Sequence, residues 1–318
     1  MTPRYSQEWL DYFIPETIEW NADDMPDLSR AVLKNLLLRS EKWPHGIPDA
    51  EVVHRVEGAV SYSRMQELAD RPLPGRYDLD HFQRIHYQLF QDVYPWAGQL
   101  RTAPQDWPMV KWGPDVAAVR NGQNHVTEIP HKYFKAREVP QAATVVLDRI
   151  AAKDNLRGLA RNDFIGELAT VWLRINFVHP FREGNTRAQF AFFRQLSAEA
   201  GYRLDTDRFH AVSKTELKQN PLVGDLREQF VWGRFEYMQT GDTRLMRDVL
   251  DHGDHRHRSA AGRPDHRPRR RSACHRRRHV RTPPHRPCVP PHYYSGGHRT
   301  TAGAVRRLPL RNGTRPMR

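Results

Sequence analysis

The residues best suited to chemistry lie within nine residues of one another, from His179 to Arg187, in the stretch HPFREGNTR. An imidazole such as that of His179 can accept a proton near neutral pH, and a carboxylate such as that of Glu183 can bind a hard metal ion. Gly184 allows close backbone approach, and the Arg187 guanidinium offers a fork of donors to phosphate oxygens. We therefore predict a phosphate site at a helix N-terminus, where N–H groups and the helix dipole attract anions.

Two apolar periodic segments must position this stretch. The first is a helix over 163–176, capped by Asn162, that ends just before His179. The second runs over 187–200 and stops at Gly201. A rigid apolar helix on each side would fix the histidine for chemistry. Their predicted core residues are Phe164, Leu168, Val171, Trp172, Ile175, Phe192, Phe193 and Leu196.

The stretch resembles the signature loop of Fic-domain proteins, H-P-F-x-(D/E)-G-N-G-R-x-x-R. A second segment, from Phe82 to Arg101, resembles the core of the same family, so that the resemblance covers about residues 78–240. It implies a mainly α fold, a Fic-type helical bundle with a short β-hairpin flap. It also implies an enzyme that transfers AMP from ATP to a Tyr, Thr or Ser hydroxyl of a target protein.

The resemblance also implies a role for each loop residue. His179 would be the general base for the attacking hydroxyl. Glu183 would hold Mg²⁺, with ATP as co-substrate. The ring of Phe181 would anchor the loop in the core. The predicted nucleotide-binding residues are Phe181, Arg182, Gly184, Asn185, Thr186 and Arg187.

Two positions depart from the signature. Thr186 stands in place of a glycine, and Phe190 stands in place of the second arginine, so that one phosphate contact is missing. Arg194, about 10 Å further along the helix than Arg187, is a candidate substitute. Three hypotheses follow: an adenylyltransferase, a Doc-like phosphotransferase that binds the nucleotide in reverse, or an inactive module that binds nucleotide or protein.

In the family, a β-hairpin flap binds the target segment by strand pairing. Here we predict the flap over 102–112 and the target-docking residues Trp107, Met109, Val110 and Lys111. Residues 113–140 read as a loop-rich insertion.

Many family members are held inactive by a helix with the motif (S/T)-x-x-x-E-(G/N). Glu57-Gly58 has Val53 at the hydroxyl position, and Glu67, four residues after Ser63, is followed by Leu68. We therefore predict no self-inhibitory helix and a separate small antitoxin protein as partner, which makes the chain a toxin candidate. By analogy, the target would be a bacterial type II topoisomerase.

Charge divides the 318-residue chain. From His252 onward there are 18 Arg, no Lys and two Asp, a net charge of +16, whereas the whole chain carries +13 and residues 1–251 therefore carry −3. We predict an N-terminal helical extension over 1–77, a Fic domain over 78–251 and a disordered basic tail over 252–318. Both cysteines lie in the tail, and neither a signal peptide nor a membrane-spanning stretch is evident, which favours the cytoplasm.

Three interpretations of the tail stay open. Its arginines could contact nucleic acid non-specifically. A Zn²⁺ site could be built from Cys274, His279, His285 and Cys288, although no standard spacing is met. The richness in Arg, Pro, His and Gly is also typical of an out-of-frame reading of a GC-rich gene.

The remaining periodic segments predict further helices. A helix that opens at Leu28 and ends before Trp43 rests on Leu28, Val32, Leu36 and Leu37. A second, over 49–69, would turn Val52, Val56, Val60 and Met65 inward. The other predicted helices cover 79–92, 141–154, 205–214, 222–240 and 242–252.

Overall fold

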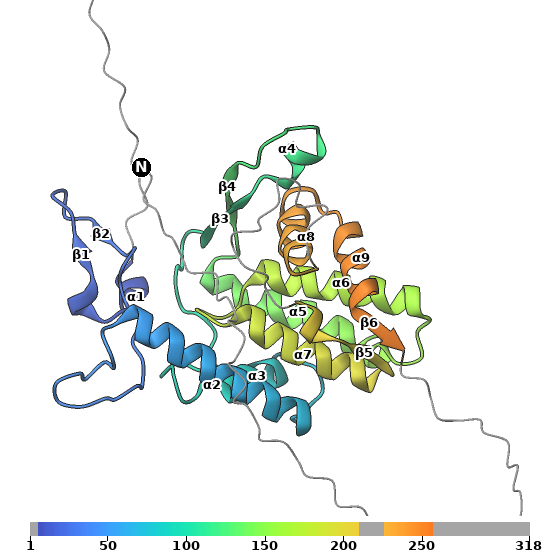
Figure 1. Cartoon of the computed structure of the whole chain (residues 1–318), viewed down its shortest axis with the longest axis horizontal. Helices are drawn as coiled ribbons and strands as arrows, with labels where there is room; N and C mark the ends of the chain where they lie inside the picture. The colour runs from blue at the N-terminus through green and yellow to red at the C-terminus, as the bar shows by residue number, and fades with distance from the viewer. Residues whose placement is uncertain (1–5, 210–225, 257–318) are drawn as a thin grey trace, which may run out of the picture.

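The computed structural model describes residues 6–209 and 226–256, and its main elements are helices (Figure 1). Three antiparallel strand pairs, β1–β2, β3–β4 and β5–β6, accompany them. The predicted mainly α class with a short hairpin is confirmed. The helices are α1 (Gln7–Leu10), α2 (Ala50–Asp70), α3 (Leu79–Phe90), α4 (Val116–Arg120), α5 (Val139–Ala151), α6 (Arg161–Val178), α7 (Asn185–Glu199), α8 (Leu226–Thr240) and α9 (Arg244–Gly253).

Helix α6 lies at the centre of the molecule, where it contacts α5, α7, α8 and α9 (Figure 1). Its apolar side chains are buried on several faces, among them Phe164, Leu168, Trp172 and Ile175. Trp172 stacks on Phe193 of α7 with ring centroids 4.5 Å apart. The predicted core of both helices is thereby confirmed, and α6 enters the loop at His179 from a fixed base.

Helix α2 begins where the sequence predicts, because the side chain of Asp49 accepts hydrogen bonds from the N–H groups of Glu51 and Val52. Of the residues predicted to face inward, Met65 is buried, whereas Val52, Val56 and Val60 are only partly buried and the residues after them, Val53, Glu57 and Ser61, are buried. The face that packs on α3 and α7 consists of Val53, Glu57, Ser61, Met65 and Leu68. The interior of the molecule thus holds a carboxylate and a hydroxyl from this helix.

The helix predicted from Leu28 to Trp43 is wrong. Long-range hydrogen bonds take up the backbone there: Ile14 N–H donates to the Val32 carbonyl (2.8 Å), and Leu36 N–H to that of Val93 (2.8 Å). The buried Asn35 side chain bonds to the backbone of Ile47 through both its oxygen and its nitrogen. These tertiary bonds replace the bonds that a helix would make within itself. The short elements before it are a 3₁₀ turn (Pro15–Thr17), β1 (Glu19–Trp20) and β2 (Pro26–Asp27).

The hairpin is longer than predicted. β3 (Val110–Pro114) pairs with β4 (Glu128–Lys132), so that Val110 faces Lys132 and Pro114 faces Glu128. The predicted flap over 102–112 contains only the start of the first strand, and the second strand lies within the predicted loop-rich insertion. Periodicity missed it because the strands are joined by residues 115–127, which include α4, and not by a short turn with a recognisable signature.

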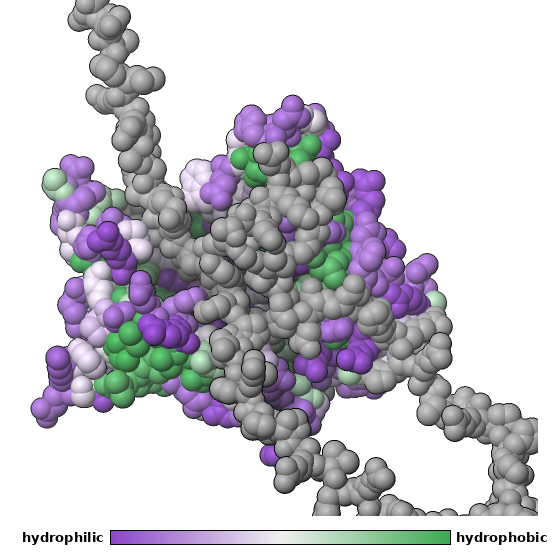
Figure 2. All heavy atoms as spheres, viewed as in Figure 1, coloured by the Kyte–Doolittle hydropathy of each residue, from purple (hydrophilic) through white to green (hydrophobic). Residues whose placement is uncertain are grey.

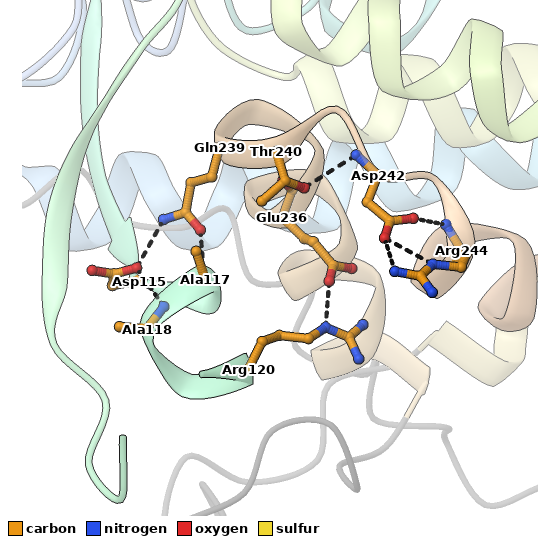
Figure 3. Close-up of polar contacts among 9 residues, drawn as sticks. All are labelled: Asp115, Ala117, Ala118, Arg120, Glu236, Gln239, Thr240, Asp242 and Arg244. Atoms are coloured by element: carbon orange, nitrogen blue, oxygen red, sulfur yellow. Dashed lines mark hydrogen bonds and ion pairs between the residues drawn. The ribbon is translucent and has the colours of Figure 1, made fainter. Parts of the chain in front are cut away.

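This long connection is anchored to α8 (Figure 3). Glu236, buried on α8, forms an ion pair with Arg120 at the end of α4. Gln239 accepts a hydrogen bond from the Ala117 N–H through its side-chain oxygen (2.9 Å). The far end of the hairpin is therefore attached to the same helix that packs on α6.

Near the C-terminal end of the described residues, β6 (Asp254–Arg256) pairs with β5 (Tyr202–Leu204). The ordered part therefore extends five residues into the region 252–318 that the sequence predicts as a tail. A 3₁₀ turn (Thr206–Phe209) occupies the start of the helix predicted over 205–214. The rest of that helix, the start of the one predicted at 222, and the predictions on the tail beyond Arg256 lie outside the described residues.

Within residues 6–209 and 226–256, no helix has the length and apolar character required to cross a bilayer. The face shown in Figure 2 is largely hydrophilic, with a few hydrophobic patches, one of them beside the start of α2 in Figure 1. Below the surface, the N-terminal residues Trp9 and Tyr12 belong to the same hydrophobic core as the central helices.

Candidate active site

The loop between α6 and α7 has two left-handed residues. His179 ends α6 with φ 53°, and Gly184 precedes α7 with φ 76°. A Cβ atom at Gly184 would also lie 2.3 Å from a ring carbon of Phe90. Only glycine suits this position, because it must satisfy both the positive φ and the close approach.

The side chain of Asn185 closes the loop. Its oxygen accepts a hydrogen bond from the Phe181 N–H (2.9 Å), and its nitrogen donates to the Phe181 carbonyl (2.7 Å). The buried Phe181 ring stacks on His86 with centroids 3.9 Å apart. The predicted anchoring of the loop by Phe181 agrees with this packing, whereas the Asn185 amide is used within the loop itself.

His86, on α3, supports the loop from below. Its Nδ1 accepts a hydrogen bond from the Gly98 N–H (2.9 Å), so a neutral imidazole carries its proton on Nε2 and donates to the Glu183 carbonyl (3.0 Å). Burial lowers the pKa of His86 to about 3. This histidine is therefore a neutral structural donor at physiological pH.

Arg101 supports the start of the loop. Its Nε donates to the His179 carbonyl (2.8 Å), and its backbone N–H donates to the Pro180 carbonyl (2.8 Å). Burial lowers its pKa to about 10, which still leaves the guanidinium charged at neutral pH. The same guanidinium also donates to the carbonyls of Ala103, Phe134 and Val178.

The His179 side chain is buried, with 4 % of the residue exposed. Its ring packs against the ring of Tyr133, with centroids 4.5 Å apart. Tyr133 directly follows β4, and burial raises its pKa to about 12, so its phenol stays neutral. The candidate base is thus held between the end of α6 and the base of the hairpin.

The Arg187 side chain points toward α2. Its guanidinium forms a buried ion pair with Glu57 and donates to the Ser61 hydroxyl (2.9 Å). It also lies over the Phe90 ring, 4.8 Å from the centroid. Burial opposes the charge of Arg187, but the Glu57 carboxylate keeps its pKa raised. Glu57 does not fit the motif of the self-inhibitory helix, because Val53, four residues before it, has no hydroxyl. In the structure, Glu57 nevertheless pairs with Arg187. The hydroxyl that Arg187 contacts belongs to Ser61, four residues after Glu57.

Arg182 lies on the other side of the loop, within the N-terminal aromatic cluster. Its guanidinium is 4.3 Å from the Trp9 ring centroid and 5.1 Å from that of Phe13. Cation–π contacts of this kind stabilise a buried arginine. The predicted nucleotide-binding residues are therefore not brought together: the Arg182 and Arg187 side chains point to different elements.

Three loop positions do meet at the N-terminus of α7. Gly184, Asn185 and Thr186 form its first turn, where backbone N–H groups have no partner within the helix. Glu183 is partly exposed beside them, and its carboxylate accepts from the Gly184 N–H (3.1 Å). Thr186 accepts a hydrogen bond from Arg234 of α8 (3.0 Å).

A magnesium ion would fit here only together with a phosphate. Within the described residues, no group of three or more His, Cys, Asp or Glu side chains could hold a metal by itself. Mg²⁺ in phosphate-transfer sites is held by one or two carboxylates plus the phosphate oxygens, with water completing its shell. One accessible carboxylate, that of Glu183 next to a helix N-terminus, suits that arrangement.

The hairpin residues predicted for target docking separate into two groups. Met109 is buried in the core and is not available to a target, and Trp107 is half-buried. Val110 is 41 % exposed, and Trp112, two residues further on the same face, is 50 % exposed. Lys111 points the other way. Burial lowers its pKa to about 8, with Glu183 and Arg234 among the charges that act on it.

A cavity of about 830 Å³ lies between α5, α6 and α8. It borders the loop only through Val178, and none of residues 179–187 lines it. The candidate site is therefore defined by the loop and not by this cavity. The residues that line the cavity include Phe134, Arg137, Val145, Arg174, Phe177 and Tyr237.

A helical bundle with a hairpin beside a loop that joins two central helices is the architecture of the Fic class of proteins. Residues 76–197 match the model of the Fic/DOC family. The chain is 30% identical over 182 residues to a probable protein adenylyltransferase, y4lH, of Sinorhizobium fredii, which covers 57% of this chain and 82% of that protein. The chain belongs to the Fic/DOC family.

Other relatives are longer. Protein adenylyltransferase VbhT of Bartonella schoenbuchensis is 34% identical over 207 residues, which is 65% of this chain and 37% of VbhT. Among solved structures, the N-terminal Fic domain of a putative cell filamentation protein of Bartonella quintana, with bound ADP, has a TM-score of 0.53 and 22% identity, and covers 71% of this chain and 92% of its own. BepC of Bartonella tribocorum, with bound AMPPNP, has a TM-score of 0.53 and 21% identity, and covers 71% of this chain and 93% of its own. These likenesses confirm the fold.

Sequence reasoning missed the roles of five residues at the site. Glu57 and Ser61 were not among the residues predicted to face inward, because that prediction followed the apolar residues Val52, Val56 and Val60. Arg234 carried no signal in the sequence, since nothing tells which side of α8 it occupies. His86 and Arg101 lie within the family-like segment, but their bonds to the loop depend on contacts far apart in the chain.

Proposed function

We propose that this chain is a protein adenylyltransferase, which transfers AMP from ATP to a Tyr, Thr or Ser hydroxyl of a target protein. The observation that supports the proposal is the loop 179–184, which joins His179 at the end of α6 to the N-terminus of α7. The relatives named as adenylyltransferases support the reaction type. The chain spans only about a third of VbhT, and therefore its own activity is a proposal.

In this reaction His179 accepts the proton of the attacking hydroxyl. The hydroxyl oxygen forms a bond to the α-phosphorus of ATP, and the bond from that phosphorus to the bridging oxygen of the β-phosphate breaks. Pyrophosphate leaves with the electron pair of that bond. The N–H groups of Asn185 and Thr186 would stabilise the negative charge of the phosphates.

Glu183 would hold Mg²⁺, which, when bound, offsets phosphate charge and orients the triphosphate. The hydrogen bond from the Gly184 N–H would keep the carboxylate oriented toward the phosphates. His86 would hold the Glu183 backbone in place through the carbonyl.

The base must be reached by its substrate. Because His179 is 4 % exposed and packs against Tyr133, the reaction requires the base of the hairpin to shift when the target binds. Catalytic contacts are often incomplete before substrates bind. The exposed face with Val110 and Trp112 would receive the target segment, beside Trp107 and Lys111.

The other predictions about partners rest on resemblance. They are a separate small inhibitory protein, a type II topoisomerase as target and a cytoplasmic location. Contact of the tail with nucleic acid concerns residues outside those described. All of them stay predictions.

Labelled ATP tests the proposed reaction. We expect label from α-labelled ATP, and none from γ-labelled ATP, on a protein of a bacterial lysate. Label from γ-labelled ATP alone would instead favour phosphate transfer. A chain that binds ATP and transfers neither label would be a binding module.

A further inference from the structure

Phe190 occupies the position of the second arginine of the family signature, and it is part of the core. Its ring lies 5.2 Å from Trp172 and 5.0 Å from Phe230, centroid to centroid. A third ring, Phe209, lies 5.2 Å away. The position has therefore become apolar, and no cation can reach the loop from there.

A guanidinium from another helix lies next to this aromatic cluster. Arg234 and Phe230 are four residues apart on α8, and the Arg234 guanidinium carbon is 4.8 Å from the Phe230 centroid. Phe230 therefore contacts both Phe190 and the Arg234 guanidinium. A stacked guanidinium is held in one orientation.

The same guanidinium reaches the loop. NH1 of Arg234 donates to the Thr186 hydroxyl (3.0 Å) and to the Asn176 side-chain oxygen (3.3 Å). Thr186 is the other departure from the signature. The two unusual residues of the loop are therefore both connected to Arg234, one through a hydrogen bond and one through Phe230.

Most of the donors of Arg234 have no partner. Its Nε is buried without a hydrogen bond, and no carboxylate within the described residues pairs with the group. Arg187, in contrast, is neutralised by Glu57. Lys111 is a second cation near Arg234, because the charges of both Glu183 and Arg234 act on it. Such an arrangement attracts an anion with several charges.

Arg194, the substitute suggested by the sequence, lies two turns further along α7 than Arg187, and no contact with the loop is found for it within the described residues. Arg234 is therefore the better candidate on geometry. We propose that Arg234 supplies the missing contact to the terminal phosphates of the nucleoside triphosphate, and that Thr186 orients it. This inference rests on the proposed function and adds a binding residue from α8.

The test compares the affinities of ATP, ADP and AMP for the purified full chain and its variants. Arg234→Gln should weaken ATP binding roughly 10- to 100-fold, as expected for a charge-assisted hydrogen bond, and leave AMP binding unchanged. The matched control is Arg227→Gln. Arg227 lies 5.9 Å from the same Phe230 ring, but about 10 Å further back along α8, and its loss should not affect binding.

Thr186→Val provides a second variant that leaves the guanidinium in place. It should weaken ATP binding several-fold, and it should have no further effect when combined with Arg234→Gln, because the two residues act as a unit. If Arg234→Gln has no cooperative unfolding transition and is therefore not folded, the ATP affinity of Thr186→Val tests the inference in its place.

Two results would overturn the inference. One is unchanged ATP affinity in Arg234→Gln or, if that variant does not fold, in Thr186→Val. The other is an equal loss of ATP and AMP affinity, which would make Arg234 a support of the fold only. Failure of the proposed function is distinguishable, since the parent chain would then transfer no label from α-labelled ATP, whatever its affinity for ATP.

Discussion

Several residues of the loop are fixed by partners from other parts of the chain. Arg101 holds the His179 carbonyl, His86 holds the Glu183 carbonyl, and Phe90 leaves room only for a glycine at 184. The loop keeps its shape because these bonds satisfy its carbonyl groups, which the adjoining helices cannot do. The chemistry of a few exposed atoms thus depends on a buried polar framework.

His86 gives this framework a pH dependence. Burial lowers its pKa to about 3, whereas an unfolded chain has an ordinary histidine value of about 6.5. Between these values only the unfolded chain binds the proton, so stability falls as the pH decreases below about 6.5. By linkage, this group alone should remove about 2 kcal/mol of unfolding free energy between pH 7 and pH 5.

Urea unfolding of the parent and of His86→Gln at both pH values measures this contribution. The variant should lose less stability on acidification than the parent, and the control His125→Gln, at an exposed histidine, should match the parent. Equal losses in the parent and His86→Gln would contradict the role given to His86.

At the scale of the element, α2 is a support for the active loop. Its buried face contains Glu57 and Ser61, which hold Arg187. The sequence predicts the extent of the helix correctly because local signals determine it. It misplaces the buried face, because a buried carboxylate is expected only when its partner is known. The helix predicted from Leu28 to Trp43 fails for a related reason, since distant backbone partners override a correct apolar spacing.

Glu57→Ala tests the support given by α2. The substitution leaves Arg187 buried without its counter-charge, and the free energy of unfolding should fall by about 3–5 kcal/mol. Glu67→Ala on the same helix is the control, because its ion pair with Arg64 is largely exposed and should contribute at most about 1 kcal/mol. Denaturant titration measures both, and equal effects would contradict the assigned support.

At the scale of the whole molecule, α8 connects the loop to the hairpin. Arg234 contacts Thr186 in the loop, Phe235 packs on His131 of β4, and Glu236 pairs with Arg120 of α4 (Figure 3). None of these contacts could be predicted from the sequence, since the residues that they join lie between 48 and 116 positions apart in the chain. The family-like loop could be predicted because its residues are consecutive.

Glu236→Gln tests this connection. Loss of the ion pair with Arg120 should loosen the hairpin connection, and the amide hydrogens of residues 116–120 should exchange faster with deuterium. Arg244→Gln is the control, because it breaks the neighbouring pair with Asp242 within the same turn. Unchanged exchange of 116–120 in Glu236→Gln would mean that the connection is held by other contacts.

The central claim is that His179 is the base of an AMP transfer. Its most direct test is the transfer of label from α-labelled ATP to a lysate protein by the parent, by His179→Ala and by the control His125→Ala. We predict that His179→Ala loses at least about 99 % of the transfer rate, as expected for loss of a general base, and keeps the unfolding transition of the parent. His125→Ala should transfer at the parental rate. Parental transfer by a folded His179→Ala chain would contradict the account.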